Sequence, residues 1–213
     1  MNLKIEISQT TIHTMKTIRL LLIFCAVNIL GAVDLDQGYI MMSKQLDRFN
    51  ALLNDENLAA ELKREQLSQV VEDTIDFERI ALKTLGPYAS KLTPEQSERF
   101  HAAFKTMLKK WLVDDLMRFE DEKITLSEYT WLPSEKKVVV KVLGREKSGL
   151  AVNNRDPHRA RTEYVLKERE GKWRIVDLTI NRVNIAHNYR SQIDALVSRG
   201  QSADDIIRLF EKP

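Results

Sequence analysis

The chain has 213 residues, of which 43% are hydrophobic and 30% are charged, and these proportions are ordinary for a globular protein. Its formal net charge of +2 gives no reason to expect nucleic acid as a partner. Composition alone assigns no function.

The first 32 residues have the order of a secretory signal peptide. Basic residues follow Met15, then an apolar run extends from Leu20 to Leu30, and small residues come after it. A run of about 11 apolar residues is too short to span a bilayer. We therefore expect a signal peptide over residues 1–32, with the start at Met15 and cleavage after Ala32, and one domain over residues 33–213.

The single cysteine, Cys25, lies inside the predicted signal peptide. A lipid-anchored N-terminus is the minor alternative, because bulky Phe24 stands where the lipoprotein signal has a small residue. If the leader is removed, the remaining chain has no cysteine, which excludes disulfides, thiolate catalysis and cysteine-ligated metals. Removing residues 1–32 also brings the net charge close to zero.

From about residue 35 to residue 120, apolar residues recur at helical spacing. Leu46, Phe49 and Leu53 share one face of a first helix, and a second follows near residues 62–71. A third is expected to end at Gly86, because glycine accepts a left-handed cap and Pro87 cannot continue the helix.

The longest predicted helix starts after Thr93. Thr93 suits the N-cap, Pro94 the first helical position, and Gln96 the reciprocal capping position. Eight apolar residues then form one stripe, which predicts a helix facing a large apolar surface. They are Phe100, Phe104, Met107, Leu108, Trp111, Leu112, Leu116 and Phe119.

From about residue 122 to residue 182 the apolar period changes to two, which predicts an antiparallel sheet with one buried face. Glu170-Gly171 has the composition of a tight hairpin turn. Apolar residues occupy both alternation phases around Ile175-Val176, which indicates two buried faces or a bulge that switches faces. Helices are expected over about 184–211, with Ser202 capping the last.

No motif for catalysis or for a metal is present in the sequence, so we predict neither kind of site. His101, His158 and His187 stand alone and are interpreted as structural or surface residues. Adjacent residues on a helix point about 100° apart, so the acidic pairs near 114–115 and 120–122 favour a solvated face. Arg190 suits either a phosphate or a salt bridge.

Two stretches resemble the MlaC family, also called toluene-tolerance proteins. Residues 77–112 contain Leu-Gly-Pro-Tyr, Thr-Pro-Glu-Gln and two phenylalanines four positions apart, and residues 171–210 contain Gly-Lys-Trp, Val-Asp, Asn-Tyr-Arg-Ser-Gln and a leucine-rich helix. Family members usually have Glu-Gly-Val-Ser-Leu where this chain has residues 181–185. The chain therefore lacks the family's glycine, at Arg182, where the last strand meets the helix.

The resemblance implies a fold as well as a function. The fold would be α+β, with a helical layer packed on a curved antiparallel sheet, a cystatin-like roll, and an apolar cavity between the layers. The protein would be a periplasmic phospholipid carrier between the inner and outer membranes. Its partners would be an inner-membrane ABC-type transporter complex and an outer-membrane lipoprotein, and it would need no cofactor and catalyse no reaction.

If acyl chains occupy such a cavity, apolar residues from both layers should form its wall. The predicted lipid-binding residues are Leu85, Phe104, Leu108, Trp111, Leu112, Val140, Tyr164, Leu166, Ile175, Leu178, Ile180 and Ile185. Each of them can equally be an ordinary core residue.

Two other functions remain open on the residues alone. A cystatin-like roll can host an isomerase or dehydratase, with Asp177 as the candidate base within an apolar strand. A periplasmic adaptor or chaperone would use an apolar groove to bind peptides.

Overall fold

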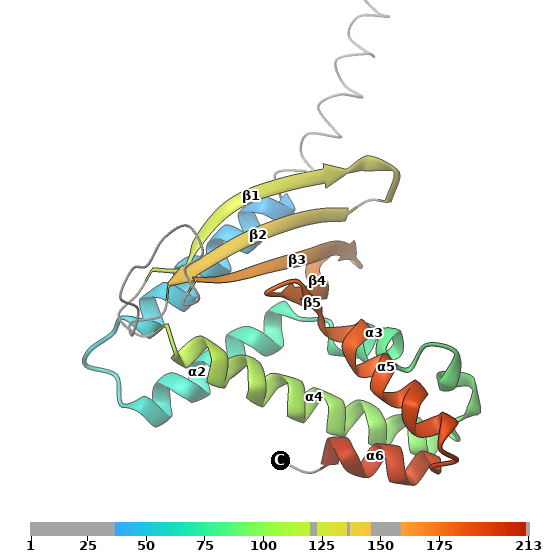
Figure 1. The fold of residues 1–213 in the computed structure, drawn as a ribbon. Helices are drawn as coiled ribbons and strands as arrows, with labels where there is room; N and C mark the ends of the chain where they lie inside the picture. The colour runs from blue at the N-terminus through green and yellow to red at the C-terminus, as the bar shows by residue number, and fades with distance from the viewer. Residues whose placement is uncertain (1–36, 120–122, 136, 146–158, 212–213) are drawn as a thin grey trace, which may run out of the picture. The chain divides into compact units, whose positions relative to one another are not determined.

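The structure is a computed structural model that describes residues 37–119, 123–135, 137–145 and 159–211 (Figure 1). The predicted signal peptide with Cys25, the acidic run at 120–122 and His158 lie outside these residues. The chain divides into two units, Met1–Gln37 and Gly38–Pro213, and all elements named below belong to the second.

The helices come in two groups along the chain. Residues 38–53 are helical and are called helix 38–53. The labelled helices are α2 (Ala60–Thr74), α3 (Phe77–Leu85), the 3-10 helix η1 (Gly86–Lys91), α4 (Pro94–Met117), α5 (Ile185–Ser198) and α6 (Ala203–Glu211).

The predicted helix boundaries are confirmed by the caps that the side chains form. Thr93 and Gln96 make a reciprocal capping box at the start of α4. Asp76 accepts a hydrogen bond from the backbone N–H of Arg79, which caps α3. Gly86 ends α3 with φ +53°, a conformation that glycine adopts without steric cost.

The sheet has five antiparallel strands in the order β1-β2-β3-β4-β5. They are β1 (Thr125–Leu132), β2 (Lys137–Arg145), β3 (Arg159–Arg169), β4 (Lys172–Ile180) and β5 (Val183–Asn184), with the 3-10 turn η2 (Pro133–Glu135) between the first two. Glu170 and Gly171 both have positive φ, as a type I′ hairpin turn requires. The α+β class and the predicted hairpin are confirmed.

The bulge predicted near Ile175-Val176 is present in β4. Tyr164 pairs with Leu178 and Leu166 pairs with Ile175, so β4 has one extra residue, Val176, opposite β3. Paired residues share a face of the sheet. The bulge therefore keeps Ile175 and Leu178 on the same face although they are three positions apart.

A short hairpin joins β4 to β5, and the sequence did not predict β5 as a strand. Asn181 and Arg182 form its turn with φ of +48° and +71°. Arg182 thus adopts the left-handed conformation although it is not a glycine, the residue that most easily allows it. The Asn181 side chain accepts a hydrogen bond from the backbone N–H of Arg161 at 3.1 Å, which fastens the turn to β3.

In Figure 1 helix 38–53 (blue) runs behind the strands, and α2 to α6 lie below the sheet. Among these helices α4 packs against α2, α3 and α6, and α3 packs against α5. Helix 38–53 approaches the sheet closely, since a Cβ atom on Gly38 would lie 3.1 Å from the Trp173 ring. The core is continuous, and every α-helix among the described residues contributes side chains to it.

The apolar stripe predicted on α4 is only partly right. Phe100, Phe104, Leu108 and Leu112 are buried, but Trp111 is 39% exposed. A stripe of eight residues over six turns is wider than the surface that the neighbouring elements cover, so its flank remains in solvent.

Candidate functional site

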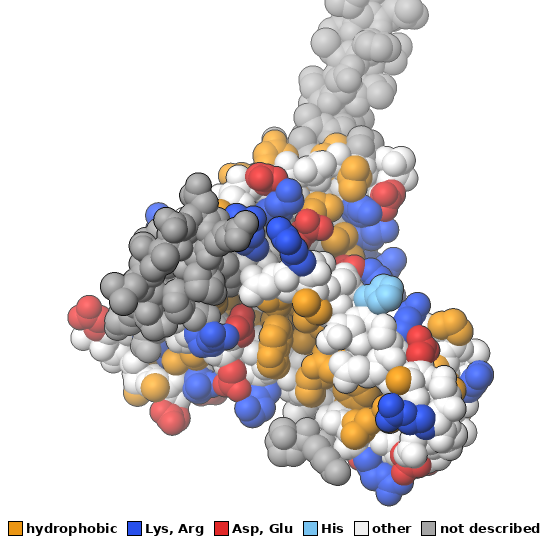
Figure 2. Space-filling view, viewed as in Figure 1, with side chains coloured by type: hydrophobic (Ala, Val, Ile, Leu, Met, Phe, Trp, Pro, Cys, Tyr) orange, Lys and Arg blue, Asp and Glu red, His pale blue; other side chains and the backbone are white. Residues whose placement is uncertain are grey.

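An apolar cavity of about 50 Å³ lies between the helical layer and the sheet. Figure 2 shows hydrophobic side chains gathered in the hollow between the sheet and α4. Three helices, which are helix 38–53, α2 and α4, meet three strands there, β2, β3 and β4. The lining residues are Met42, Leu46, Phe49, Val71, Thr74, Ile75, Leu112, Asp115, Leu116, Phe119, Ile124, Val142, Thr162, Tyr164, Ile175 and Ile180.

Each wall arises from a simple sequence pattern. Helix 38–53 contributes Met42, Leu46 and Phe49 from its buried face, at helical spacing. The sheet contributes a row of directly paired residues, Val142 with Thr162 and Thr162 with Ile180. One wall is therefore a helix face and the other is a cross-strand row.

The polar groups of the cavity are few, and three of them are close to one another. Burial raises the pKa of Tyr164 to about 12, and the negative charge of Asp115 adds to this shift, whereas a hydrogen bond with Thr162 opposes it. Tyr164 is therefore a neutral phenol at physiological pH. The fourth polar group, the Thr74 hydroxyl, donates to the Val70 carbonyl oxygen at 2.6 Å.

The structure separates the two neighbouring aspartates of α4. Asp114 forms ion pairs with Arg64 and Lys110 on the outer side of the helix, as expected for a solvated face. For Asp115 that prediction is wrong, because its side chain lines the apolar cavity and is 26% exposed. Residues 108, 112, 115 and 119 follow helical spacing, so Asp115 lies on the buried face of α4.

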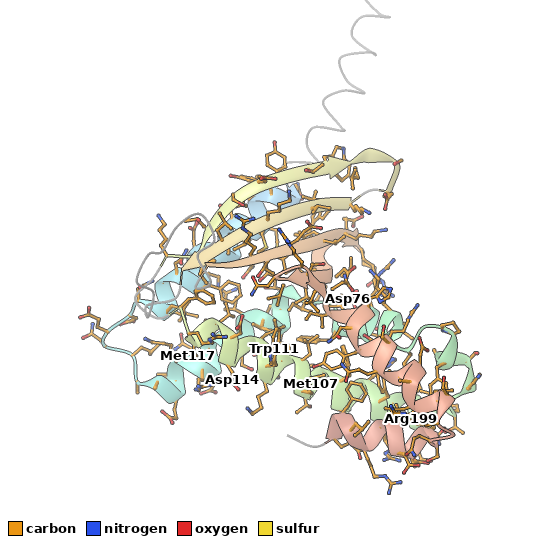
Figure 3. The ribbon with its side chains drawn as sticks, viewed as in Figure 1. Asp76, Met107, Trp111, Asp114, Met117 and Arg199 are labelled. Atoms are coloured by element: carbon orange, nitrogen blue, oxygen red, sulfur yellow. The ribbon has the colours of Figure 1, made fainter. Side chains whose placement is uncertain are left out.

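Four of the twelve predicted wall residues line the cavity: Leu112, Tyr164, Ile175 and Ile180. Trp111 lies on the exposed flank of α4, where Figure 3 labels it beside Met107 and Asp114. The remaining seven are buried in the core outside the cavity lining. They are Leu85, Phe104, Leu108, Val140, Leu166, Leu178 and Ile185. Contact of any of the twelve with a lipid stays a prediction.

Sequence reasoning missed the walls contributed by helix 38–53, by α2 and by the end of α4. The apolar spacing of Leu46 and Phe49 identified a buried face, but not the element that this face covers. Thr162 was missed although it stands two residues before Tyr164, a spacing that places both on one face of β3. Its polar hydroxyl distinguishes it from the mostly apolar residues of the predicted wall.

Asp177, the candidate base of the alternative enzyme, does not line the cavity. It forms an ion pair with Lys83 of α3 and accepts a hydrogen bond from Asn184 Nδ2 at 3.0 Å. The bulge places Asp177 toward α3 and α5, away from the cavity face. The assignment of Asp177 as a base inside the cavity is therefore wrong.

Arg190 and the two described histidines also lie outside the cavity. The Arg190 guanidinium donates to the Lys83 carbonyl oxygen and packs against Gly86, where a Cβ atom would collide with it. His101 packs near the Phe100 ring and His187 is in the first turn of α5. Arg190 thus joins α5 to the end of α3.

No helix within residues 37–119, 123–135, 137–145 and 159–211 is long and apolar enough to cross a membrane. The same part of the chain holds no group of three or more His, Cys, Asp or Glu side chains arranged to hold a metal ion.

The fold and the cavity define a class: an α+β protein with an apolar space between its sheet and its helices. A family model described as MlaC protein matches residues 43–212. The chain therefore belongs to the MlaC family, as its sequence motifs indicated.

Two known proteins are similar to this chain. The toluene tolerance protein Ttg2D of Pseudomonas putida is 25% identical over 144 residues, which cover 66% of this chain and 62% of that relative. A phospholipid-binding protein from Ralstonia solanacearum, solved in complex with a phospholipid, shares the fold with a TM-score of 0.64 at 16% identity. That likeness covers 80% of this chain and 93% of the other.

Proposed function

We propose that this protein is a phospholipid carrier that encloses acyl chains between its helical layer and its sheet. The observation that carries the proposal is the apolar cavity between the two layers, found in a chain of the MlaC family. The phospholipid complex of the Ralstonia solanacearum protein, which has the same fold, supports this ligand class.

The apolar lining suits a ligand whose binding energy is mostly hydrophobic. Each methylene kept from water is worth about 0.8 kcal/mol, so one tail of about 16 carbons represents roughly 13 kcal/mol. Non-directional contacts recover this free energy without a fixed binding geometry. Such a ligand can then be released to a second apolar site, which a carrier requires.

Lipid uptake must enlarge the cavity. An engineered apolar cavity of about 150 Å³ binds benzene, whereas the cavity here measures about 50 Å³. An acyl chain is several times longer than benzene, so the walls must move apart when it enters. The cavity thus marks where the two layers separate.

We further propose that the carrier acts in the periplasm after removal of residues 1–32, and that it catalyses no reaction itself. Its partners would be an inner-membrane ABC-type lipid transporter complex and an outer-membrane lipoprotein. This part of the proposal is supported by the family and by the signal-like order of residues 1–32. Cell fractionation with mass measurement of the processed chain tests it, and an unprocessed cytoplasmic chain would contradict it.

Native mass spectrometry of protein purified without detergent tests the ligand. We expect an adduct with the mass of one or more phospholipids, confirmed by solvent extraction. A peptide adduct would support a chaperone instead. A protein that neither carries phospholipid nor takes it from vesicles would overturn the carrier.

A pair of matched variants connects the ligand to the cavity. Leu116→Glu places a charge in the cavity wall, whereas Leu82→Glu places one on a side chain that is 44% exposed on α3. We expect Leu116→Glu to lose most bound lipid and Leu82→Glu to retain it, with thermal unfolding confirming that both fold. Equal lipid content in the two variants would show that the lipid lies elsewhere.

A further inference from the structure

Resting on the proposed function, we propose that helix 38–53 is the cavity wall that opens for a lipid, by rotating about its C-terminal end. This helix contributes Met42, Leu46 and Phe49 to the cavity lining. In Figure 1 it runs behind the strands, whereas α2 to α6 lie below the sheet. The two ends of the helix are held by different kinds of contact, and this difference determines which end moves.

Polar bonds fasten the C-terminal end of helix 38–53. The Asn50 side chain donates to the Ile124 carbonyl oxygen and accepts from the Ile124 backbone N–H, both at 2.8 Å. Lys63 of α2 is buried, and its ammonium group donates to the Leu53 carbonyl oxygen at 3.0 Å. The helix dipole also favours a cation at the last carbonyl groups. These bonds join this end both to α2 and to the residue before β1, and together they form a hinge.

The N-terminal end of the helix meets the sheet through apolar and aromatic contacts. The centroid of the Tyr39 ring lies 5.1 Å from that of the Tyr129 ring of β1. Gly38 fits so closely that a Cβ atom there would lie 3.1 Å from the Trp173 ring of β4. Within the part of the chain that the structure describes, no hydrogen bond or ion pair joins residues 38–49 to another element. We call the contacts of Gly38 and Tyr39 with the sheet the latch, and they can separate without leaving a buried polar group unpaired.

The other walls of the cavity are joined to one another. α2 packs against α4, and the two helices are linked by the ion pair of Arg64 with Asp114 and by those of Glu72 with two lysines of α4. The strands β2, β3 and β4 are joined by ladders of paired residues. Moving one of these elements would break polar bonds, whereas opening the latch separates only apolar surfaces. Helix 38–53 is therefore the wall that opens most easily.

The lipid itself can stabilise the open position. Opening exposes the buried side chains of Met42, Leu46 and Phe49, which is unfavourable in water. An acyl chain that enters beside them restores the apolar contacts that they lose. The helix therefore remains closed in water and opens when an apolar ligand is available.

The test closes the latch with a covalent cross-link. Tyr39→Cys and Tyr129→Cys place two thiols on exposed side chains, and a short bismaleimide joins them. The chain after residue 32 has no other cysteine. Lipid-stripped protein then takes up a fluorescent phospholipid from vesicles of equal parts phosphatidylethanolamine and phosphatidylglycerol. We expect the cross-linked protein to take it up at least about tenfold more slowly than the same variant without the cross-link.

A matched cross-link tests the walls that should stay in place. Arg64→Cys and Asp114→Cys place two exposed thiols on α2 and α4, at side chains that contact each other as an ion pair. Joining them with the same reagent should leave lipid uptake unchanged. Thermal unfolding of both variants, with and without the reagent, confirms that they are folded.

Gly38→Ala should change uptake in the opposite direction. The added Cβ atom would lie 3.1 Å from the Trp173 ring and 3.2 Å from Val138 Cγ2, which is closer than favourable contact between carbon atoms. It therefore weakens the latch and leaves the cavity lining unaltered. We expect uptake to be about two- to tenfold faster. This variant also decides the proposal if the cysteine variant of the latch does not fold.

Each outcome decides between the proposals. Unchanged uptake after the latch is cross-linked, a comparable loss after α2 and α4 are cross-linked, or unchanged uptake by Gly38→Ala would overturn the opening of helix 38–53 and leave the carrier standing. Failure of the unaltered protein to take up phospholipid from the vesicles would overturn the carrier itself.

Discussion

The two halves of α4 present similar apolar faces to very different surroundings. In the first half, Phe100 and Phe104 belong to an aromatic cluster completed by Tyr189 of α5 and Phe210 of α6. Neighbouring ring centroids in this cluster lie 5.0 to 6.1 Å apart. In the second half, Leu112 and Leu116 face the cavity instead.

The difference comes from what lies opposite each half. α6 packs along the first half of α4, and its Phe210 contacts the rings of both Phe104 and Tyr189. The second half lines the cavity together with a row of paired sheet residues, Val142, Thr162 and Ile180. These side chains are shorter than aromatic rings, so they leave space. The same helix thus stabilises the fold at one end and lines the candidate site at the other.

Phe104→Ala tests the packed half and should have the largest effect. Phe104 is fully buried within the aromatic cluster, so its loss leaves a large cavity. We expect a loss of about 3–5 kcal/mol in the free energy of unfolding, measured by chemical denaturation. A loss as small as that of Leu116→Ala would remove the distinction between the two halves.

Val140→Leu and Val142→Leu test the space beside the second half. Both valines are buried on the same face of β2, but only Val142 lines the cavity. We expect Val140→Leu to lose about 1–3 kcal/mol through overpacking. Val142→Leu should be neutral or stabilising by up to about 1 kcal/mol, because the cavity accepts the extra volume.

Lipid content gives the second readout for the same pair. Val142→Leu should carry less lipid than the unaltered protein although it is no less stable. Equal losses of stability in the two leucine variants would show that the cavity does not accept a larger side chain.

Arg182→Gly tests the turn between β4 and β5, which leads the chain into α5 and so toward the aromatic cluster. Arg182 has φ +71°, which costs a residue with a Cβ about 1–2 kcal/mol. Glycine removes this cost but adds flexibility to the unfolded chain, so we expect a gain of no more than about 1 kcal/mol. Arg199→Gly is the control, because Arg199 has φ −89°, and it should give no gain.

Glu72→Gln should change the free energy of unfolding least, and its effect should depend on pH. Hydrogen bonds from Lys105 and Lys109 of α4 lower the pKa of Glu72 from 4.5 to about 2. They fasten α2, which carries Val71 of the cavity, to α4. The side chain is 36% exposed, so solvent screening limits the contribution to less than about 1 kcal/mol.

The pH dependence follows from the direction of that shift. A carboxylate whose pKa is lower in the folded state stabilises the protein above its unfolded pKa, and this stabilisation is lost as pH falls. Denaturation at several pH values should show Glu72→Gln less stable than the unaltered protein at pH 7, with the difference disappearing between pH 4.5 and 2. A constant difference would assign the effect to something other than this charge.

Much of the local structure could be predicted from short stretches of sequence. Hydrogen bonds and backbone angles within a few residues determine three such features. They are the capping box of Thr93 and Gln96, the helix end at Gly86 and the hairpin turn at Glu170-Gly171. The bulge was detectable because apolar residues in both phases near Val176 conflict with a regular strand. The hairpin at Asn181-Arg182 was missed since arginine is uncommon at a positive φ.

The sequence by itself determined the α+β class, the family, most of the element boundaries and the apolar faces, because all of these depend on periodicity and on neighbours along the chain. Only the tertiary structure decided which faces meet. It placed Phe104 in a filled cluster, left Trp111 in solvent, and turned Asp115 into the cavity and Asp114 away from it. The reason is physical: whether an apolar face is packed or leaves a cavity depends on the volume of side chains that come from distant parts of the chain.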